Sequence, residues 1–278
     1  ALGSFVGHGS PIVGAAFVSG GRLVTAAADD SAIVWEVDAP WKLDRVIGAV
    51  TQPDVIADRV LAVDCSGDSS LIVAGGGVPS RTGELAVFQV ADGHRVLHVP
   101  DAHDDAILAA RFSPDGKRIA SAGADKYVRT FDAVSGERVR RFEGHTNYVL
   151  AVSWKSDGQT LASASADNSV KLWDAETGDQ RVSVATFKRH VTAVRFVGDG
   201  DTFVTGCGDR IVRLHNNAGG VIRTFPEMAG WIHSVDVTPG GDYLVAGAAD
   251  GSVKAWNANN GQALAEPTLP LTAQAGSD

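Results

Sequence analysis

The stretch Gly144–Asp174, GHTNYVLAVSWKSDGQTLASASADNSVKLWD, decides the fold of this 278-residue chain. Three runs of alternating apolar residues lie inside it, separated by turn-forming residues that include Asp157-Gly158 and Asp167-Asn168. Alternation with a period of two indicates β-strands, and clusters of Ser, Asp, Asn and Gly indicate turns. The stretch therefore predicts three consecutive strands, at Tyr148–Trp154, Thr160–Ser165 and Ser169–Trp173.

The same unit recurs along the chain. Its third strand carries an aromatic or imidazole residue at a fixed place, namely Trp35, Phe88, Phe131, Trp173, His215 and Trp256. Most of these marks lie about 40 residues apart, a period typical of repeat architectures. One unit cannot bury both faces of its own sheet, so the units must stack. We expect one domain over residues 1–269, with repeats at about 8–48, 49–100, 101–143, 144–186, 187–226 and 227–269.

The two ends of the chain carry separate expectations. Residues 1–6 correspond to Arg138–Phe142, the outer strand that precedes Gly144-His145, so they predict an outermost strand that closes the ring. Gly261–Leu269 competes for the same sheet edge. Residues 270–278 have no periodicity and are expected to be disordered. Because the chain starts at Ala1 without Met, a removed leader and a longer parent protein are both open.

Composition excludes several classes of protein. The chain is 44% hydrophobic and 21% charged with a net charge of −9, which argues against direct binding to nucleic acid. No apolar run is long enough to cross a bilayer, so membrane insertion is not expected. Cys65 and Cys207 lie in different repeats and form neither a disulfide framework nor a metal-binding spacing. No metal and no cofactor are expected.

The GH…D…WD pattern on its period of about 40 residues resembles the WD-repeat β-propellers. The resemblance covers residues 1–269 and implies an all-β fold of four-stranded antiparallel blades around a central channel. Such propellers usually have seven blades, and six repeats are visible here. A six-bladed ring and a seven-bladed parent that lost one blade are therefore both open.

Four segments carry a narrower resemblance to propeller units of bacterial multidomain proteins, some of which also carry c-type cytochrome domains. They are RFSPDG, LASASADNSVKLWD, VRFVGDG and VRLHNN. This resemblance implies an extracytoplasmic (periplasmic) protein, and without it a cytoplasmic one. The chain has no C-x-x-C-H motif, so any haem would lie outside it.

The family resemblance implies a structural hydrogen-bond network within a blade. A turn Asp bonds a His, the His bonds a Ser or Thr on the second strand, and that hydroxyl bonds the indole of the Trp. The matching residues are Asp167, His145, Ser163 and Trp173 in the fourth repeat, Asp29, His8, Thr25 and Trp35 in the first, and Asp125, His103 and Ser121 in the third.

A Ser, a His and an Asp within reach of one another also suggest a catalytic triad. We reject this interpretation because the set recurs in several repeats and its hydroxyl faces an indole inside the sheet. The segments His103-Asp104-Asp105 and Asp199-Gly200-Asp201 could bind a cation, but turns use Asp routinely and no set of four ligands converges. No catalytic residue is therefore assigned.

Partner binding is expected on the face where the first strand of each blade begins. Tyr148, His190, Trp231 and Arg59 stand just before those strands, and Lys126 and Arg210 follow the turn Asp. Tyr, Trp and Arg are the residue types that anchor protein interfaces, although scattered surface aromatics are also common.

The leading hypothesis is a non-catalytic interaction or scaffolding propeller that binds a protein partner of unknown identity, with a place in a larger bacterial assembly as one option. One alternative is an enzyme or redox-associated propeller with a site at the channel mouth. Ionisable residues that converge on the channel would favour it, but most inward-facing positions are small or apolar. Another alternative is a structural subunit that polymerises by donating the strand at residues 1–6.

Overall fold

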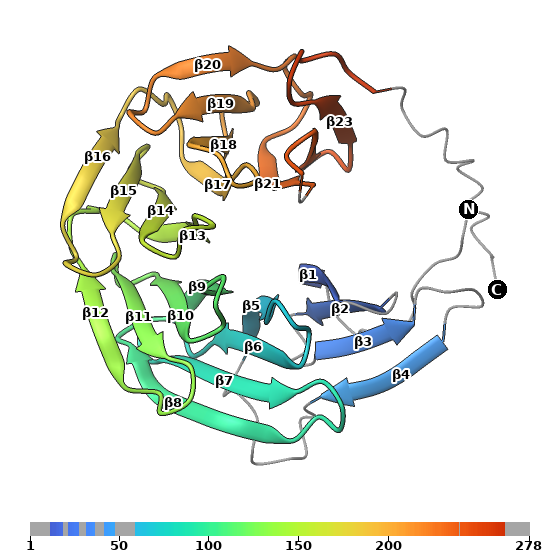
Figure 1. Ribbon diagram of the computed structural model, residues 1–278, viewed down its shortest axis with the longest axis vertical. Helices are drawn as coiled ribbons and strands as arrows, with labels where there is room; N and C mark the ends of the chain where they lie inside the picture. The colour runs from blue at the N-terminus through green and yellow to red at the C-terminus, as the bar shows by residue number, and fades with distance from the viewer. Residues whose placement is uncertain are drawn as a thin grey trace.

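The computed structural model describes residues 12–18, 22–27, 32–36, 42–47, 59–238 and 240–264. Twenty-three strands run through these residues, and none of the residues described lies in a helix. The strands form six antiparallel sheets in which each strand pairs with the next one along the chain (Figure 1). The predicted all-β fold of propeller blades is confirmed.

The first three sheets are four-stranded, and we call them blades 1 to 3. Blade 1 contains β1 (Ile12–Val18), β2 (Arg22–Ala27), β3 (Ala32–Glu36) and β4 (Lys42–Ile47). Blade 2 contains β5 (Val60–Cys65), β6 (Leu71–Gly76), β7 (Gly83–Gln89) and β8 (Arg95–His103). Blade 3 contains β9 (Ile107–Phe112), β10 (Arg118–Gly123), β11 (Val128–Asp132) and β12 (Arg138–Phe142).

The remaining sheets are blades 4 to 6. Blade 4 contains β13 (Val149–Trp154), β14 (Thr160–Ser165), β15 (Val170–Asp174) and β16 (Gln180–Val184). Blade 5 contains β17 (Val191–Phe196), β18 (Thr202–Cys207), β19 (Arg213–Asn216) and β20 (Val221–Thr224). Blade 6 contains three strands, β21 (Ile232–Val237), β22 (Tyr243–Ala248) and β23 (Val253–Asn257).

The blades follow one another around an arc in chain order (Figure 1). The first strand of each blade lies nearest the centre, and the fourth strand of blades 1 to 5 lies at the periphery. Each first strand contacts the first strand of the next blade, from β1 through β5, β9, β13 and β17 to β21. The first strands of the described blades therefore line the inner side of the arc, where the resemblance implied a central channel.

The hydrophobic core is divided into layers between neighbouring blades. Because strand side chains alternate between two faces, each blade shares one apolar layer with the preceding blade and one with the following blade. Between blades 4 and 5 the layer joins Ala162 and Val170 to Val194 and Phe203. Between blades 5 and 6 it joins Val204 and Val212 to Ile232, Leu244 and Trp256. At about 25 cal/mol for each Å² of apolar surface, these layers are the main stabilising term of the fold.

The far face of blade 6 is uncovered by the described residues. Val245 and Val253 are 37% and 58% exposed, whereas their equivalents in blade 5, Val204 and Val212, are fully buried. Among the described residues, β21 and β1 do not share the extensive contact that joins the other neighbouring first strands. The two ends of the arc thus do not pack as the other blades do.

The outer edge of blade 6 is taken up in part by the segment after β23. Ala263 forms an antiparallel bridge with Trp256, and the amide of Leu264 donates to the carbonyl oxygen of Ala255 at 2.9 Å. The strand at residues 1–6, which was also predicted to pair with a blade edge, lies outside the described residues. The tail at 270–278 lies outside them as well. Ring closure and the repeat boundaries stay predictions.

Candidate functional site

Blade 4 holds a connected network of four side chains. His145 Nδ1 lies 2.8 Å from Asp167 Oδ2, and His145 Nε2 lies 2.8 Å from Ser163 Oγ. The indole Nε1 of Trp173 donates to the same Ser163 oxygen at 2.8 Å. The structure thus brings together the four residues that the sequence placed in one network, and it adds Ser169, which donates to Asp167 at 2.6 Å.

The chemistry of the partners sets every proton in this network. A carboxylate only accepts, so His145 Nδ1 carries the proton and Nε2 accepts the hydroxyl hydrogen of Ser163. Burial lowers the pKa of His145, which keeps the imidazole neutral. Burial acts to raise the pKa of Asp167, but hydrogen bonds from Ser169 and His145 hold it below its ordinary value.

Blade 3 repeats the arrangement without the indole. His103 bonds Asp125 at 2.9 Å and Ser121 at 2.7 Å. An arginine that sequence reasoning overlooked, Arg129, lies 3.1 Å from the second oxygen of Asp125. Of the predicted blade 1 set, Thr25 is buried, and His8, Asp29 and the side chain of Trp35 lie outside the described residues.

Blade 5 has a different solution at the same positions. Phe187 stands where blade 4 has His145, and the turn carboxylate of Asp209 instead pairs with both terminal nitrogens of Arg213, at 3.0 and 2.7 Å. His215 replaces the tryptophan; its Nδ1 donates to the carbonyl oxygen of Gly219 at 3.3 Å, so its Nε2 accepts from the Thr205 hydroxyl at 3.1 Å. Burial lowers the pKa of His215 to about 4. A cation four residues after a turn Asp is the sequence signal that could have revealed the Asp209–Arg213 pair.

Cys207 occupies the position that Ser165 holds in blade 4. The Ser165 hydroxyl bonds the carbonyl of Tyr148 at 2.8 Å, and the Cys207 thiol bonds the equivalent segment through the Arg189 carbonyl at 3.3 Å. Burial raises the pKa of the Cys207 thiol to about 11. Cys207 therefore acts as a buried structural thiol.

The networks offer no accessible nucleophile. The Ser163 side chain is fully buried, and its oxygen already bonds His145 and Trp173. In the segment 103–105, Asp104 pairs with Arg129 at 2.8 Å and Asp105 accepts from the amide of Ser80 at 2.6 Å. Among the described residues no three His, Cys, Asp or Glu side chains are placed to share a metal ion.

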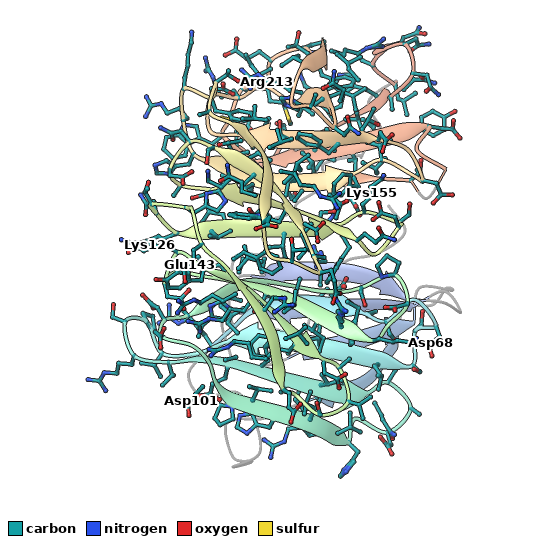
Figure 2. All side chains as sticks on the ribbon, turned by 60° about the vertical axis from the view of Figure 1, so that its left-hand side comes forward. Asp68, Asp101, Lys126, Glu143, Lys155 and Arg213 are labelled. Atoms are coloured by element: carbon teal, nitrogen blue, oxygen red, sulfur yellow. The ribbon has the colours of Figure 1, made fainter. Side chains whose placement is uncertain are left out.

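The six predicted rim residues lie on one face of the ring. In five blades the carbonyl of the residue before the first strand accepts from the turn at the end of the second strand, as when Ala166 donates to Tyr148 and Gly208 to His190. This bond places both groups of predicted residues side by side at one end of each blade. All six are exposed, namely Arg59, Lys126, Tyr148, His190, Arg210 and Trp231. We call this end of the blades the rim face, and in Figure 2 Lys126 projects on the side opposite Lys155.

The turn residues of the rim face adopt a strained backbone. Lys126, Asn168 and Arg210 have φ values of 74°, 63° and 71°, in the left-handed region that side-chain-bearing residues rarely enter. Gly251 holds the equivalent place in blade 6, with φ of 81°. The shared conformation gives Lys126 and Arg210 the same direction of exit from their blades.

Trp231 is the largest exposed side chain on the rim face. Its ring is 51% exposed, and the Arg189 guanidinium carbon lies 5.8 Å from the ring centroid, within cation–π range. Lys188 and His190 flank Arg189, and Arg210 pairs with Glu227. Among the described residues Lys188 and Arg189 have no carboxylate partner. Blades 5 and 6 thus present a basic and aromatic patch on an acidic protein.

Comparison with known proteins decides the family. The profile of the WD domain, G-beta repeat, matches residues 1–36, 94–132, 136–174, 181–216 and 219–257, more than half of the chain. The chain belongs to the WD-repeat family. WD-repeat proteins generally mediate protein–protein interaction or scaffolding.

Three relatives illustrate the breadth of the similarity. The WD repeat-containing protein 26 homolog of Drosophila melanogaster is 32% identical over 127 residues, 44% of this chain and 19% of that protein. The meiotic recombination protein rec14 of Schizosaccharomyces pombe is 26% identical over 50% of this chain and 42% of its own length. Human WD repeat-containing protein 3 is 28% identical over 45% of this chain and 12% of its own. The chain spans less than half the length of each.

Proposed function

We propose that this WD-repeat protein is a non-catalytic interaction module that binds a protein partner through its rim face. The observation that carries the proposal is Trp231, half exposed yet held by Arg189 in a ring contact. Tryptophan, tyrosine and arginine contribute most to interface hot spots, and a side chain that is already ordered loses less entropy on binding.

The patch also supports a class of partner. Arg189 lies over the ring of Trp231, Lys188 and His190 flank Arg189 in the chain, and Arg210 on the same blade pairs with Glu227. Positive groups around an aromatic anchor attract an acidic segment and set its orientation more than they add affinity. The proposed ligand is therefore an acidic peptide segment with an apolar residue that packs on Trp231.

The experiment is a pull-down with the immobilised chain and a source-cell extract, with bound proteins identified by mass spectrometry. A double variant, Trp231→Ala with Tyr148→Ala, removes two rim aromatics. The matched control is Ile222→Ala with Val221→Ala, on outer strand β20. Ile222 is as exposed as Trp231, at 51%, and Val221 is as exposed as Tyr148, at 49%.

Loss of one specific partner in the rim variant, with its retention in the control and equal melting temperatures for both, supports the proposal. Retention of every partner in the rim variant discards the rim face as the binding site. The narrower resemblance to bacterial cytochrome-linked modules stays a prediction, since the relatives described above come from a fly, a yeast and human.

A further inference from the structure

A ring of polar side chains lines the channel at one register position. The fifth residues of β5, β9, β13, β17 and β21 are paired with Val73, Ala120, Ala162, Val204 and Val245, which hold equivalent places on the second strands. We call these five residues the channel ring: Asp64, Arg111, Ser153, Arg195 and Asp236. They lie about 13 Å along the strands from the first-strand ends at the rim face.

The channel ring borders two hollows that share three of its members. One, of about 670 Å³, is lined by all five ring residues together with Trp154 and Tyr243. The other, of about 550 Å³, is lined by Arg111, Arg195 and Asp236 and by the residues three positions closer to the rim, which are Leu61, Leu108 and Leu150 in blades 2 to 4 and Thr192 and His233 in blades 5 and 6. Volumes of this size suit small molecules.

The two signs of charge are segregated around the ring. Arg111, Ser153 and Arg195 occupy three consecutive blades, and Asp64 and Asp236 flank them on the outer two. The formal charges cancel, yet one side of the channel is positive and the other negative. Burial raises the pKa of Asp64. The negative charge of Asp236 also raises it, whereas the positive charge of Arg111 lowers it.

The ion pairs within the ring are loose. Arg111 Nη1 lies 3.5 Å from Asp64, and Arg195 Nε lies 3.4 Å from Asp236, whereas the Arg213–Asp209 pair inside blade 5 closes to 2.7 Å. Each ring arginine is anchored instead on a carbonyl of the preceding blade, Val63 at 3.0 Å and Val152 at 3.4 Å. Neither Nη2 group has a hydrogen-bond partner among the described residues. Two oriented guanidinium groups therefore keep donors available to the channel.

We propose that the channel ring binds a small zwitterion of dipeptide size. Its carboxylate accepts from Arg111 and Arg195 beside Ser153, and its ammonium group lies against Asp64 and Asp236. Guanidinium groups match a carboxylate in geometry and charge, and a dipeptide spans about 7 Å between its termini. An apolar side chain on the ligand packs against Leu61, Leu108 and Leu150. This site is separate from the proposed rim interface, and neither depends on the other.

The test is isothermal titration of the full chain with three matched probes. Glycyl-L-leucine carries both charges, N-acetyl-glycyl-L-leucine lacks the ammonium group, and glycyl-L-leucinamide lacks the carboxylate. We expect glycyl-L-leucine to bind at least about ten-fold more tightly than either blocked probe. Absence of binding at about 10 mM, or equal affinity for all three probes, overturns the proposal.

Two variants assign each end of the ligand. Arg195→Gln should weaken the binding of glycyl-L-leucine about ten-fold, so that it binds no more tightly than glycyl-L-leucinamide. Asp236→Asn should make glycyl-L-leucine bind no more tightly than N-acetyl-glycyl-L-leucine. Asp236 is 71% exposed at its side chain, so its variant tests the site even if Arg195→Gln loses stability. Arg138→Gln, on exposed outer strand β12, is the matched control. Unchanged discrimination in Asp236→Asn contradicts the assignment.

Discussion

Blades 4 and 6 fill the same internal positions with different chemistry. Blade 4 has His145 before its first strand and Ser163 on its second strand, and the Ser163 hydroxyl links the imidazole of His145 to the indole of Trp173. Blade 6 has Met228 and Ala246 at those places, and the indole nitrogen of Trp256 is buried without a hydrogen-bond partner. Both tryptophans are fully buried.

The difference teaches that a buried ring at this position of the third strand, rather than the hydrogen-bond network, is the common element of blade packing. Replacing both partners of a buried hydrogen bond by apolar groups costs little, whereas removing one partner leaves the other unsatisfied. Blade 6 lost the His and the hydroxyl together and kept an apolar contact through Met228. Its only cost is the one unpaired indole N–H.

The largest effect that sharpens this comparison is expected for Met228→Ala. Met228 is buried in the layer between blades 5 and 6, and its truncation leaves a cavity. We expect the free energy of unfolding to fall by about 2–5 kcal/mol, measured by urea denaturation. Val221→Ala, on an exposed outer strand, serves as the control. A loss as small as that of the control would show that Met228 does not replace the histidine as a packing element.

The blades with a buried imidazole, blades 3 to 5, should also differ from blade 6 in their response to acid. In the unfolded chain His215 titrates near 6.5, and in the fold its pKa is about 4. Between these pH values only the unfolded state takes up the proton, so the free energy of unfolding falls as the pH drops from 6.5 to 4. The slope is about 1.4 kcal/mol for each pH unit, or about 3 kcal/mol in all. Burial lowers the pKa of His103 and His145 in the same direction.

The variant His215→Phe isolates the contribution of His215 to the pH dependence of the free energy of unfolding. Phenylalanine keeps the stacking on Phe203, whose ring lies 4.9 Å from the imidazole, and carries no proton. Denaturation at pH 7 and pH 4.5 should show a smaller loss for the variant than for the parent. Equal losses would mean that His215 is not held neutral by burial.

His145→Ala tests the network of blade 4 directly. Asp167 and Ser163 each lose a partner, and we expect the free energy of unfolding to fall by about 1–3 kcal/mol while partner binding is retained. Ser163→Ala and the double variant complete a thermodynamic cycle. The double variant should cost less than the sum of the two, since both ends of one bond are then removed. Unchanged thermal stability in His145→Ala would show that the network is not formed.

The smallest effect is expected in the reverse direction, for Ala246→Ser. A hydroxyl at this position gives Trp256 the acceptor that Ser163 gives Trp173. We expect a gain of about 0.5–1.5 kcal/mol in the free energy of unfolding. Ala248→Ser, two residues along the same strand, is the control. A loss of stability would show that the fit around Trp256 leaves no room for an oxygen atom.

The fold was predictable because its signals repeat. Alternation and turn residues predicted the strands of blade 4, and the recurring Asp and Trp predicted the other blades. The partners of Asp167 followed from the family resemblance. Arg213 was missed although it stands four residues after Asp209, as Arg129 stands four residues after Asp125, because a lone cation on a third strand also suits an exposed side chain.

The channel ring was missed for a different reason. Asp64, Ser153, Arg195 and Asp236 each stand five residues after a predicted rim residue, but the mixture of residue types at this position forms no recognisable motif, and only the structure shows that these side chains border one hollow. The sequence expectation that inward-facing positions are mostly small or apolar holds for Leu61, Leu108 and Leu150 in blades 2 to 4, but it fails at Thr192 and His233 and at the channel ring. Likewise, the contact between Trp231 and Arg189 depends on how blades 5 and 6 meet.

Cys207 gives the fold a built-in reporter. With its thiol buried and its pKa near 11, the residue cannot react with an alkylating reagent while blade 5 is intact. Modification therefore requires β18 to separate from its neighbours. The rate at which this thiol is alkylated therefore reports the local opening of blade 5, and no probe has to be introduced.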